Sequence, residues 1–344
     1  MSLDSRLQQI WYGKSTLALL LAPLSWLFHL ALLMRRFAFR IGLLRSFRVS
    51  KPVIVVGNIT VGGTGKTPLV LWLAKALQDA GHCVGIVMRG YGADHSVVLR
   101  DVHADSDPLE AGDEAVLVAS KSNAIVVVCR DRVAAARRAI ERGASIIVSD
   151  DGLQHYALAR DVEIAVVDRS RALGNGLLLP AGPLREPAMR LQSVDVVAVN
   201  MRESPPQAPH FEYQAAESKQ AVIHYRLHIE GVQSLLTGEL RSLASFGQTP
   251  VHAIAGIGNP AAFFASLRTA GLDVDAHALP DHAAIGISDV AFGDRAPVLM
   301  TEKDAVKCQA FADERMWSVA VQVSMSESDA QRLLDVVNAV RTGA

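Results

Sequence analysis

The sequence predicts an α/β fold, and three features of its pattern lead to that prediction. Short runs of β-branched residues, such as 53–56 and 146–148, alternate with segments of helical spacing. These runs are apolar throughout, as in parallel strands that are covered on both faces. Half of the 344 residues are hydrophobic, which is enough for a substantial core, and the length suggests two domains. We therefore expect a parallel sheet with helices on both faces.

The first predicted unit begins after Lys51-Pro52. We expect its strands at residues 53–56, 84–88, 125–129, 146–148, 164–168 and 194–200. We expect its helices at residues 69–80, 111–121 and 132–142, because Gly81 and Gly143 stand where the first and last of them should end. In a sheet of this kind, ligands bind at the carboxyl ends of the strands.

A polar, proline-containing stretch at 202–217 interrupts this alternation and is typical of a linker. A more polar strand at 221–230 follows and could connect the two halves. For the second unit we expect strands at 251–256 and 297–301, a helix at 260–270, and a last amphipathic helix at 328–340.

The N-terminal region differs in composition from the rest of the chain. Residues 1–51 contain eight Lys or Arg against one Asp, a local charge of +7, whereas residues 15–34 contain no charged side chain. A membrane-spanning helix needs roughly 20 apolar residues, and Trp11, Tyr12 and Trp26 could lie at a membrane interface. We expect a helix in or on a membrane; whether it spans the bilayer or lies flat stays open, and a buried core helix is the alternative.

Composition excludes several other classes of protein. The net charge of −1 gives no overall field that would attract nucleic acid. The three cysteines, Cys83, Cys129 and Cys308, are far apart and form no metal-ligand cluster with histidine. This usage fits a reducing compartment and small buried hydrophobic side chains. The oligomeric state stays open.

A glycine-rich turn between the first strand and the first helix predicts a phosphate-binding loop. It contains Gly62, Gly63, Thr64, Gly65, Lys66 and Thr67, and Thr60 stands where the Walker A pattern usually has its first glycine. Backbone N–H groups of this loop and of the helix N-terminus would face the phosphates of ATP. Lys66 would reach the β and γ oxygens, and the Thr67 hydroxyl would bind Mg²⁺.

Two adjacent carboxylates, Asp150 and Asp151, follow the strand at 146–148. In P-loop proteins an acidic residue at such a strand end holds Mg²⁺. Neighbouring aspartates repel each other unless a cation or hydrogen-bond donors are near, which favours a metal site. The alternative is that one of them caps the next helix. We therefore predict a P-loop NTPase-like α/β/α domain at 51–215, a second, smaller α/β domain at 216–344 with the linker and the C-terminal helix, and an N-terminal hydrophobic, membrane-associated segment at 1–50.

Several short motifs together resemble the tetraacyldisaccharide 4′-kinase family of lipid A biosynthesis. They occur in order along nearly the whole chain, and they are Gly62–Pro68, Arg89–Gly92, Gly112–Glu114, Asp150–His155, Pro180–Pro187, Gly256–Pro260 and Thr301–Val306. The irregular phosphate loop with Thr60 is similar to that family as well.

The resemblance implies transfer of the γ-phosphate of ATP to the 4′-hydroxyl of tetraacyldisaccharide 1-phosphate, which forms lipid IVA. It also implies that the enzyme acts on a lipid-linked substrate at the cytoplasmic face of the inner membrane. Two P-loop-like α/β/α domains would be joined by a hinge, with the active site between them.

The resemblance assigns roles to individual residues. Asp113 would receive the proton of the sugar hydroxyl, and His282 would support it from the second domain. Arg185 would suit the 1-phosphate of the substrate, because guanidinium binds phosphate through two hydrogen bonds. Weaker substrate-side candidates are Tyr91, Gln154 and His155. From the residues alone, Asp113 could instead be a helix cap, His282 a structural histidine and Arg185 a solvated side chain.

Two further residues and one rival function complete the expectations. Lys303 and Asp304 follow a predicted strand and could form an internal salt bridge or contribute to the cleft. The rival is a membrane-bound ATPase switch of the partitioning or cell-division type, which has a lysine immediately before its two loop glycines. Val61 occupies that position here.

Overall fold

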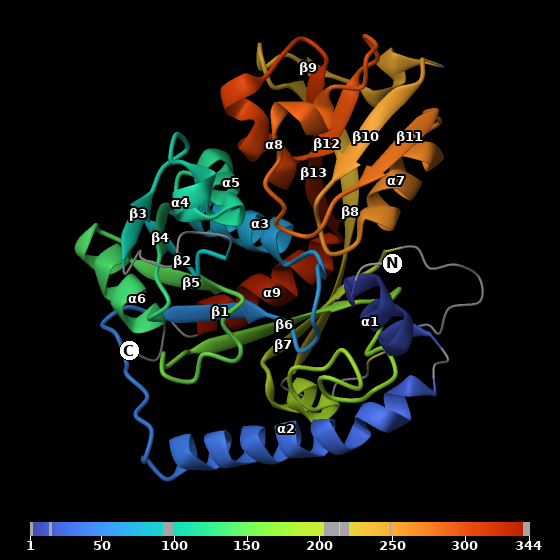
Figure 1. Cartoon of the computed structure of the whole chain (residues 1–344). Helices are drawn as coiled ribbons and strands as arrows, with labels where there is room; N and C mark the ends of the chain where they lie inside the picture. Colours follow the sequence, from blue (N-terminus) through green and yellow to red (C-terminus); the bar gives the residue numbers. More distant parts are fainter. Residues whose placement is uncertain are drawn as a thin grey trace.

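The computed structural model describes residues 3–13, 16–91, 99–202, 213, 220–247 and 249–339. It has the predicted α/β class, with an N-terminal helical segment and two α/β units (Figure 1). The predicted linker at 202–217 lies outside the described residues except for Arg202 and Tyr213, and so does Gly92 of the sequence motifs.

The first unit contains β1 (Val53–Gly57), β2 (Val84–Met88), β3 (Arg100–Val102), β4 (Ile125–Val128), β5 (Ile146–Asp150), β6 (Val162–Asp168) and β7 (Val196–Asn200). Its α-helices are α3 (Lys66–Asp79), α4 (Pro108–Ala111), α5 (Asp113–Lys121) and α6 (Arg132–Glu141), and a 3-10 helix covers Ala188–Ser193.

The second unit contains β8 (Ala221–Ser234), β9 (Leu240–Arg241), β10 (Val251–Ala255), β11 (Val274–Ala278), β12 (Val298–Thr301) and β13 (Met316–Met325). Its α-helices are α7 (Pro260–Thr269), α8 (Glu302–Cys308) and α9 (Glu327–Ala339), with 3-10 helices at Leu243–Phe246, Ile287–Val290 and Gln309–Phe311.

The described strands form one mixed sheet of 13 strands, ordered β11-β10-β12-β13-β8-β7-β6-β1-β5-β2-β4-β3, with β9 paired to β8. From β7 to β4 every pairing is parallel, as predicted. Three antiparallel pairings, β3 with β4, β13 with β8 and β9 with β8, were not predicted. Sequence patterns missed β3 because it is only three residues long. They missed β13 because it changes from a buried run to alternating burial halfway along.

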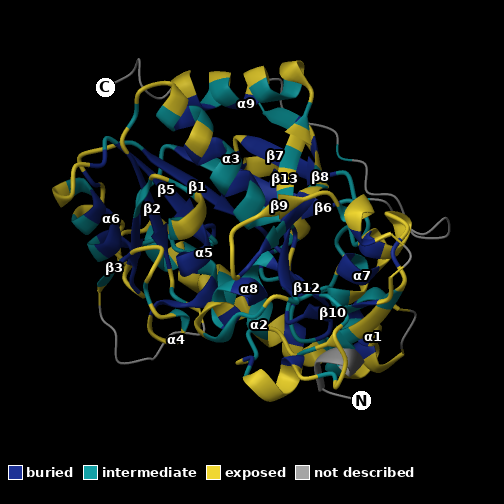
Figure 2. Ribbon diagram, turned by 90° about the horizontal axis from the view of Figure 1, so that it is seen from above, coloured by how far each residue is buried: buried dark blue, intermediate teal, exposed yellow. Residues whose placement is uncertain are grey.

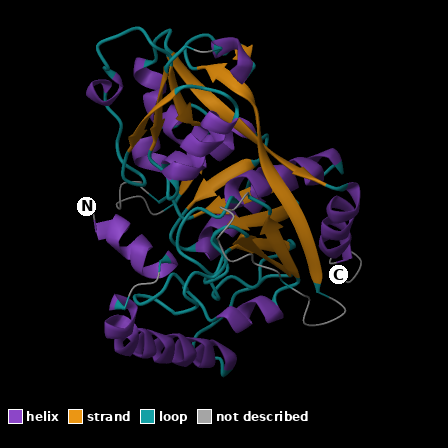
Figure 3. Cartoon of the chain, turned by 90° about the vertical axis from the view of Figure 1, so that its right-hand side faces the viewer, coloured by secondary structure: helices purple, strands orange, loops and turns teal. Residues whose placement is uncertain are grey.

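Strand β8 is the covalent and hydrogen-bonded link between the units. Its first residues pair with β7, and the rest pair with β13, so the two long strands run through both halves of the molecule (Figure 3). The register between β8 and β13 shifts at Ala320/Val321, which is a β-bulge. Helix α9 follows β13 and returns to pack on β8, and its Leu333 and Val337 join the core of the first unit.

The core of the first unit lies on both faces of its sheet. Alternate residues of each strand pack against α3, α5 and α9 on one face, and against α6 and the loops after β5 and β6 on the other. The strands are accordingly buried, whereas the outward faces of α9 are exposed (Figure 2). This arrangement fixes the carboxyl ends of β1, β5 and β6 side by side at one edge of the sheet.

Two helices precede the first unit, α1 (Leu3–Tyr12) and α2 (Leu17–Arg40). α2 runs lengthwise along the first unit (Figure 1). The Ser25 hydroxyl donates to the carbonyl of Leu178 at 2.7 Å and accepts from the N–H of Ala181 at 3.0 Å. Most of the helix is nevertheless exposed and apolar, with Leu20 75% and Trp26 72% exposed. Within the described part of the chain, α2 is the helix whose length and composition would allow it to cross a bilayer.

Candidate active site between the two units

The predicted phosphate loop lies between β1 and α3, at the carboxyl edge of the sheet. Gly65 has φ +87°, and a Cβ there would stand 2.6 Å from the Asn200 amide nitrogen, so this position requires glycine. Asn200 Nδ2 donates to the carbonyl of Thr64 at 3.1 Å, and the buried Tyr225 hydroxyl donates to the carbonyl of Gly65 at 3.1 Å. Strands β7 and β8 therefore hold the loop from behind.

The start of the loop is anchored by a second backbone segment. Thr60 is buried, and the N–H groups of Val61 and Arg185 donate to the carbonyls of Pro183 and Ile59 at 2.8 and 2.7 Å. Gly62, with φ +103°, and the exposed Gly63 complete the turn. The Pro180–Pro187 motif thus shapes the phosphate loop directly.

Lys66 is the first residue of α3 and points along the carboxyl edge of the sheet. Its ammonium group donates to Asn58 Oδ1 at 3.1 Å and lies 3.3 Å from Asp151 Oδ1. Thr67 follows it in the first turn of α3 and is half-buried. The sequence analysis missed Asn58, because its contact with Lys66 appears only once β1 and α3 are placed.

The two adjacent aspartates have opposite surroundings. Asp150 ends β5 and is 3% exposed, and its Oδ1 accepts no hydrogen bond from the described residues. Burial raises the pKa of Asp150 to about 7, with a further rise from the Glu114 carboxylate and an opposing effect of Lys66. Such a carboxylate would gain strongly from a cation, and oxygen ligands of this kind suit Mg²⁺.

Asp151, in contrast, contacts two cationic side chains, Lys66 and Arg185. Its Oδ2 accepts from Arg185 Nη1 at 2.8 Å, while Oδ1 faces Lys66. Burial alone would raise the pKa of Asp151, but these two cations outweigh it and hold the pKa well below its usual range. Its backbone is left-handed, with φ +49°, which is uncommon for a residue other than glycine.

The substrate-side candidates surround this pair. Gln154 Nε2 donates to the carbonyl of Asn58 at 3.0 Å and to Glu186 Oε2 at 3.3 Å, so its amide holds the loop after β5. Burial and nearby arginines lower the pKa of the half-buried His155 to about 4, so this imidazole is neutral. Tyr91 is 41% exposed, and its hydroxyl accepts from Arg89 at 2.8 Å.

A second charged cluster joins the two units. Asp113 is the first residue of α5 and 4% exposed, and its Oδ1 accepts from His282 Nδ1 at 3.0 Å. His282 Nε2 lies 3.1 Å from the Lys303 ammonium, which also contacts Glu114 at 3.3 Å. The Lys303 ammonium can only donate to Nε2, so this contact favours the His282 tautomer whose Nδ1–H points at Asp113.

The charged groups of this cluster shift one another's pKa values. Burial would raise the pKa of Asp113, but the hydrogen bond from His282 and the charge of Lys303 outweigh it and lower the pKa. The same hydrogen bond raises the pKa of His282, opposed by burial and by Lys303. Burial would lower the pKa of Lys303, but the carboxylates of Glu114, Asp113 and Asp281 outweigh it and raise the pKa.

Behind this cluster, Lys307 bridges two buried carboxylates. Its ammonium lies 3.4 Å from Asp113 Oδ2 and 2.9 Å from Asp304 Oδ1. Asp304 also accepts from the Thr301 hydroxyl at 2.6 Å and from the N–H of Gly256 at 2.9 Å. Asp304 therefore positions Lys307 rather than pairing with Lys303. Sequence reasoning missed Lys307, although its spacing of four from Lys303 on one helix was a usable signal.

The two clusters face a common space. A small pocket is lined by residues from both, among them Tyr91, Glu114, Arg132, Asp150 and Asp151. A loop of the second unit also covers the phosphate loop, because a Cβ on Gly258 would stand only 3.0 Å from the N–H nitrogen of Gly63. Arg171, which sequence reasoning also missed, donates to the carbonyl of Gly258 at 3.3 Å. The fold thus brings the phosphate loop, the paired aspartates and the Asp113–His282 pair to one place.

Known proteins are similar to this chain over nearly its whole length. A family model described as tetraacyldisaccharide-1-P 4′-kinase matches residues 17–339. The tetraacyldisaccharide 4′-kinase of Nitrosococcus oceani is 43% identical over 335 residues, 97% of this chain and 95% of that protein. That of Xanthomonas euvesicatoria pv. vesicatoria is 46% identical over 329 residues, 95% of this chain and 94% of that protein. The crystal structure of "apo" form LpxK from Aquifex aeolicus in complex with ATP superposes with a TM-score of 0.80 at 27% identity, covering 94% of this chain and 99% of that one.

The substitution Asp113→Asn tests the charged cluster through protein stability. The lowered pKa of Asp113 means that its ionised form stabilises the fold above its unfolded pKa of about 3.9, and that this contribution is lost as pH falls through the folded value. We expect Asp113→Asn to cost about 1–3 kcal/mol of unfolding free energy near neutral pH, because His282 and Lys307 each lose a charged partner, although Lys307 keeps Asp304. The difference in unfolding free energy between the two proteins should become smaller as the pH falls, because the Asp113 carboxylate becomes protonated. Urea unfolding of both proteins across this pH range measures it.

The matched control is Glu239→Gln, which removes an exposed carboxylate paired with Arg241. It should leave stability nearly unchanged at every pH. A deficit of Asp113→Asn that is as large in acid as at neutral pH would contradict the electrostatic origin.

Proposed function

This chain belongs to the tetraacyldisaccharide-1-P 4′-kinase family, and we propose that Asp113 is the residue that receives the proton of the sugar hydroxyl. The activity is ATP-dependent: the γ-phosphate moves from ATP to the 4′-hydroxyl of tetraacyldisaccharide 1-phosphate, and lipid IVA results. The rival reading as an ATPase switch is not favoured. The observation that carries the proposal is the Asp113–His282 hydrogen bond across the two units, next to the phosphate loop.

The role of Asp113 follows from its surroundings. Its Oδ1 is occupied by His282 Nδ1 and by the N–H of Glu114, whereas Oδ2 accepts no hydrogen bond from the described residues and has the Lys307 ammonium 3.4 Å away. Oδ2 can therefore accept the hydrogen bond of a substrate hydroxyl. Because phosphoryl transfer has a loose transition state, orientation of that hydroxyl matters more than a strong base. This suits a carboxylate whose pKa is lowered.

His282 and Lys303 are positioning residues in this scheme. The neutral imidazole donates to Asp113 and accepts from Lys303, which fixes the carboxylate in one orientation. His282 has φ +59°, a left-handed conformation that is uncommon for histidine and that the surrounding contacts must maintain.

ATP would be held by the phosphate loop. The N–H groups from Gly62 to Thr67 and the N-terminus of α3 favour the negative phosphates. Lys66 is close enough to Asp151 to exchange that contact for the β and γ oxygens without leaving the edge of the sheet.

Mg²⁺ fits the donor set next to this loop. The buried Asp150 carboxylate and the Thr67 hydroxyl would hold it, with Asp150 the stronger candidate for direct contact, because Asp151 is engaged by Lys66 and Arg185. When bound, the ion neutralises charge on the β- and γ-phosphates. Asp151 would then affect the Mg²⁺ site only indirectly, because it contacts and positions Lys66.

Arg185 is our candidate for the 1-phosphate of the lipid. Its Nη1 contacts Asp151, which leaves other N–H donors of the guanidinium for a phosphate. Tyr91, Gln154 and His155 lie around the same edge, where Tyr91 is the most exposed. We propose that Tyr91 contacts the sugar and that the other two shape the site.

We keep the division of the chain at 1–50, 51–215 and 216–344 as part of the proposal. Closure of the second unit over the first would exclude water, so that ATP is not hydrolysed in place of transfer. The contact of the Gly258 loop with Gly63 supports this reading.

The exposed apolar face of α2 suits a membrane surface. Trp26 and most of its leucines are exposed, whereas Leu21 and Leu32 pack against the protein, and basic residues cluster at its C-terminal end, among them Arg35, Arg36 and Arg40. Such a helix partitions into the interface and is attracted by anionic lipids. We propose that α2 lies on the cytoplasmic face of the inner membrane, where the acyl chains of the substrate can stay in lipid.

The role of Asp113 predicts a specific loss of transfer. Asp113→Asn should lower kcat by about 10²–10⁴-fold, and His282→Gln should lower it less, because the carboxylate remains. The assay follows radiolabelled γ-phosphate from ATP to tetraacyldisaccharide 1-phosphate in detergent. Glu239→Gln serves as control. If Asp113→Asn keeps a kcat within a few-fold of the unmodified protein, Asp113 is not the proton acceptor.

The role of Arg185 predicts a change in substrate discrimination. The unmodified enzyme should prefer the 1-phosphorylated disaccharide over the same lipid without that phosphate, and Arg185→Ala should reduce the preference, measured as a ratio of kcat/KM, by about tenfold. The exposed Arg241→Ala should leave the ratio unchanged. If Arg185→Ala loses the same activity on both lipids, Arg185 acts by holding Asp151 and does not contact the 1-phosphate.

The role of α2 predicts weaker membrane binding after charge is placed on its exposed face. The double variant Leu20→Glu/Trp26→Glu should reduce co-sedimentation with vesicles containing anionic phospholipid by at least about tenfold, because burial of each such side chain contributes about 1.5–3 kcal/mol. Leu236→Glu, which changes an exposed leucine of the second unit, is the matched control. Equal binding of all three proteins would rule out the α2 face as the membrane contact.

A further inference from the structure

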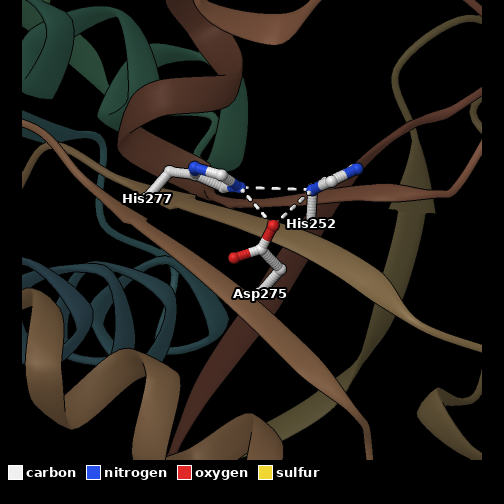
Figure 4. Close-up of side chains that lie close together, drawn as sticks. All are labelled: His252, Asp275 and His277. Atoms are coloured by element: carbon white, nitrogen blue, oxygen red, sulfur yellow. Dashed lines mark hydrogen bonds and ion pairs between the residues drawn. The ribbon is translucent and has the colours of Figure 1, made fainter. Parts of the chain in front are cut away.

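Three side chains outside the kinase site converge at the edge of the sheet in the second unit. His252 lies on β10, and Asp275 and His277 lie on the neighbouring strand β11. His252 stands opposite Asp275 in the register, and residues two apart on a strand share a face, so all three side chains project from the same side (Figure 4).

The three ligand atoms form a nearly equilateral triangle. His252 Nδ1 lies 3.2 Å from His277 Nε2, and Asp275 Oδ2 lies 3.3 Å from each of those nitrogens. Ligands at about 2.0 Å from a tetrahedral zinc ion stand about 3.3 Å from one another. The triangle therefore has the dimensions of one face of a zinc coordination tetrahedron.

The surroundings fix the rings in this arrangement. The other nitrogen of His252, Nε2, lies 3.2 Å from Asp294, so its proton is on Nε2 and its Nδ1 lone pair faces the triangle. A carboxylate behind a ligating histidine is the usual second partner in metal sites. Phe292 stacks on both rings, with centroid distances of 3.9 and 4.3 Å.

Charge balance also favours a divalent cation. Two neutral imidazoles bring two lone pairs, and Asp275 and Asp294 bring two negative charges to the same small region. Without a cation, either one proton on His277 Nε2 serves both His252 and Asp275, or a protonated His252 pairs with both Asp275 and Asp294.

We propose that His252, Asp275 and His277 bind a Zn²⁺-like transition-metal ion, with Asp294 orienting His252 and the fourth position left to water. The ion would join the edge strand β11 to β10 and to the segment carrying Asp294 and Phe292. Its role is structural, and the site is separate from the Mg²⁺ and ATP site, because its residues lie on other strands and contact none of the residues assigned to the reaction.

Metal content of the purified full-length protein tests this proposal. After chelator treatment, the protein is dialysed against limiting Zn²⁺, and bound zinc is measured by atomic emission. We expect about one more zinc per chain in the unmodified protein than in His277→Ala. His228→Ala, which removes an exposed histidine from β8, should bind as much as the unmodified protein. Co²⁺ in place of Zn²⁺ should give the intense visible absorption of tetrahedral coordination, absent in His277→Ala.

Thermal unfolding supplies a second readout. Saturating Zn²⁺ should raise the Tm of the unmodified protein and of His228→Ala by about 4 °C or more, and that of His277→Ala by much less. All three proteins should keep full kinase activity with Mg²⁺ and ATP, which shows that they are folded and separates this test from the kinase proposal. Equal zinc content in the unmodified protein and His277→Ala, or no bound zinc in either, would overturn the proposal and leave a hydrogen-bonded cluster.

Discussion

The hydrogen bond between Asp113 and His282 is the contact on which the rest of the structure depends. It joins α5 of the first unit to a loop of the second, where Asp113 is buried and His282 is half-buried. A buried carboxylate without partners would be costly, so Asp113 requires Lys307 and His282, and His282 in turn is held by Lys303. Under the proposed roles, contact between the two units also completes the surroundings of Asp113.

The paired aspartates, Asp150 and Asp151, differ in their electrostatic surroundings. Their side chains start from adjacent residues, yet burial outweighs the nearby cations and raises the pKa of Asp150, whereas Lys66 and Arg185 outweigh burial and lower the pKa of Asp151. Asp151 has a left-handed backbone and its carboxylate contacts Arg185 and Lys66, whereas Asp150 is the buried last residue of β5. Under the proposed roles, one carboxylate would bind the cation while the other contacts Lys66.

Local motifs were sufficient to predict the α/β class, the membrane-type helix and the phosphate loop, because each depends on residues close in sequence. The Asp113 candidate came from a family resemblance, and its physical meaning appeared only with its partners, since His282 is 169 residues away. Asn58, Lys307 and Arg171 escaped prediction for the same reason: each is an ordinary polar residue until the fold supplies its contact. The His252–Asp275–His277 triangle likewise exists only through the register of two strands.

The continuity of β8 has a mechanical consequence. A strand that is hydrogen-bonded to β7 at one end and to β13 along the rest cannot act as a loose tether, because a wide swing of one unit would tear its ladder of hydrogen bonds. Relative motion is cheapest as torsion about the strand axis, and the bulge beside Ala320 is where the ladder already tolerates extra twist. The two long strands that both units share therefore resist a wide hinge opening, and any rotation of the second unit over the phosphate loop must twist this ladder.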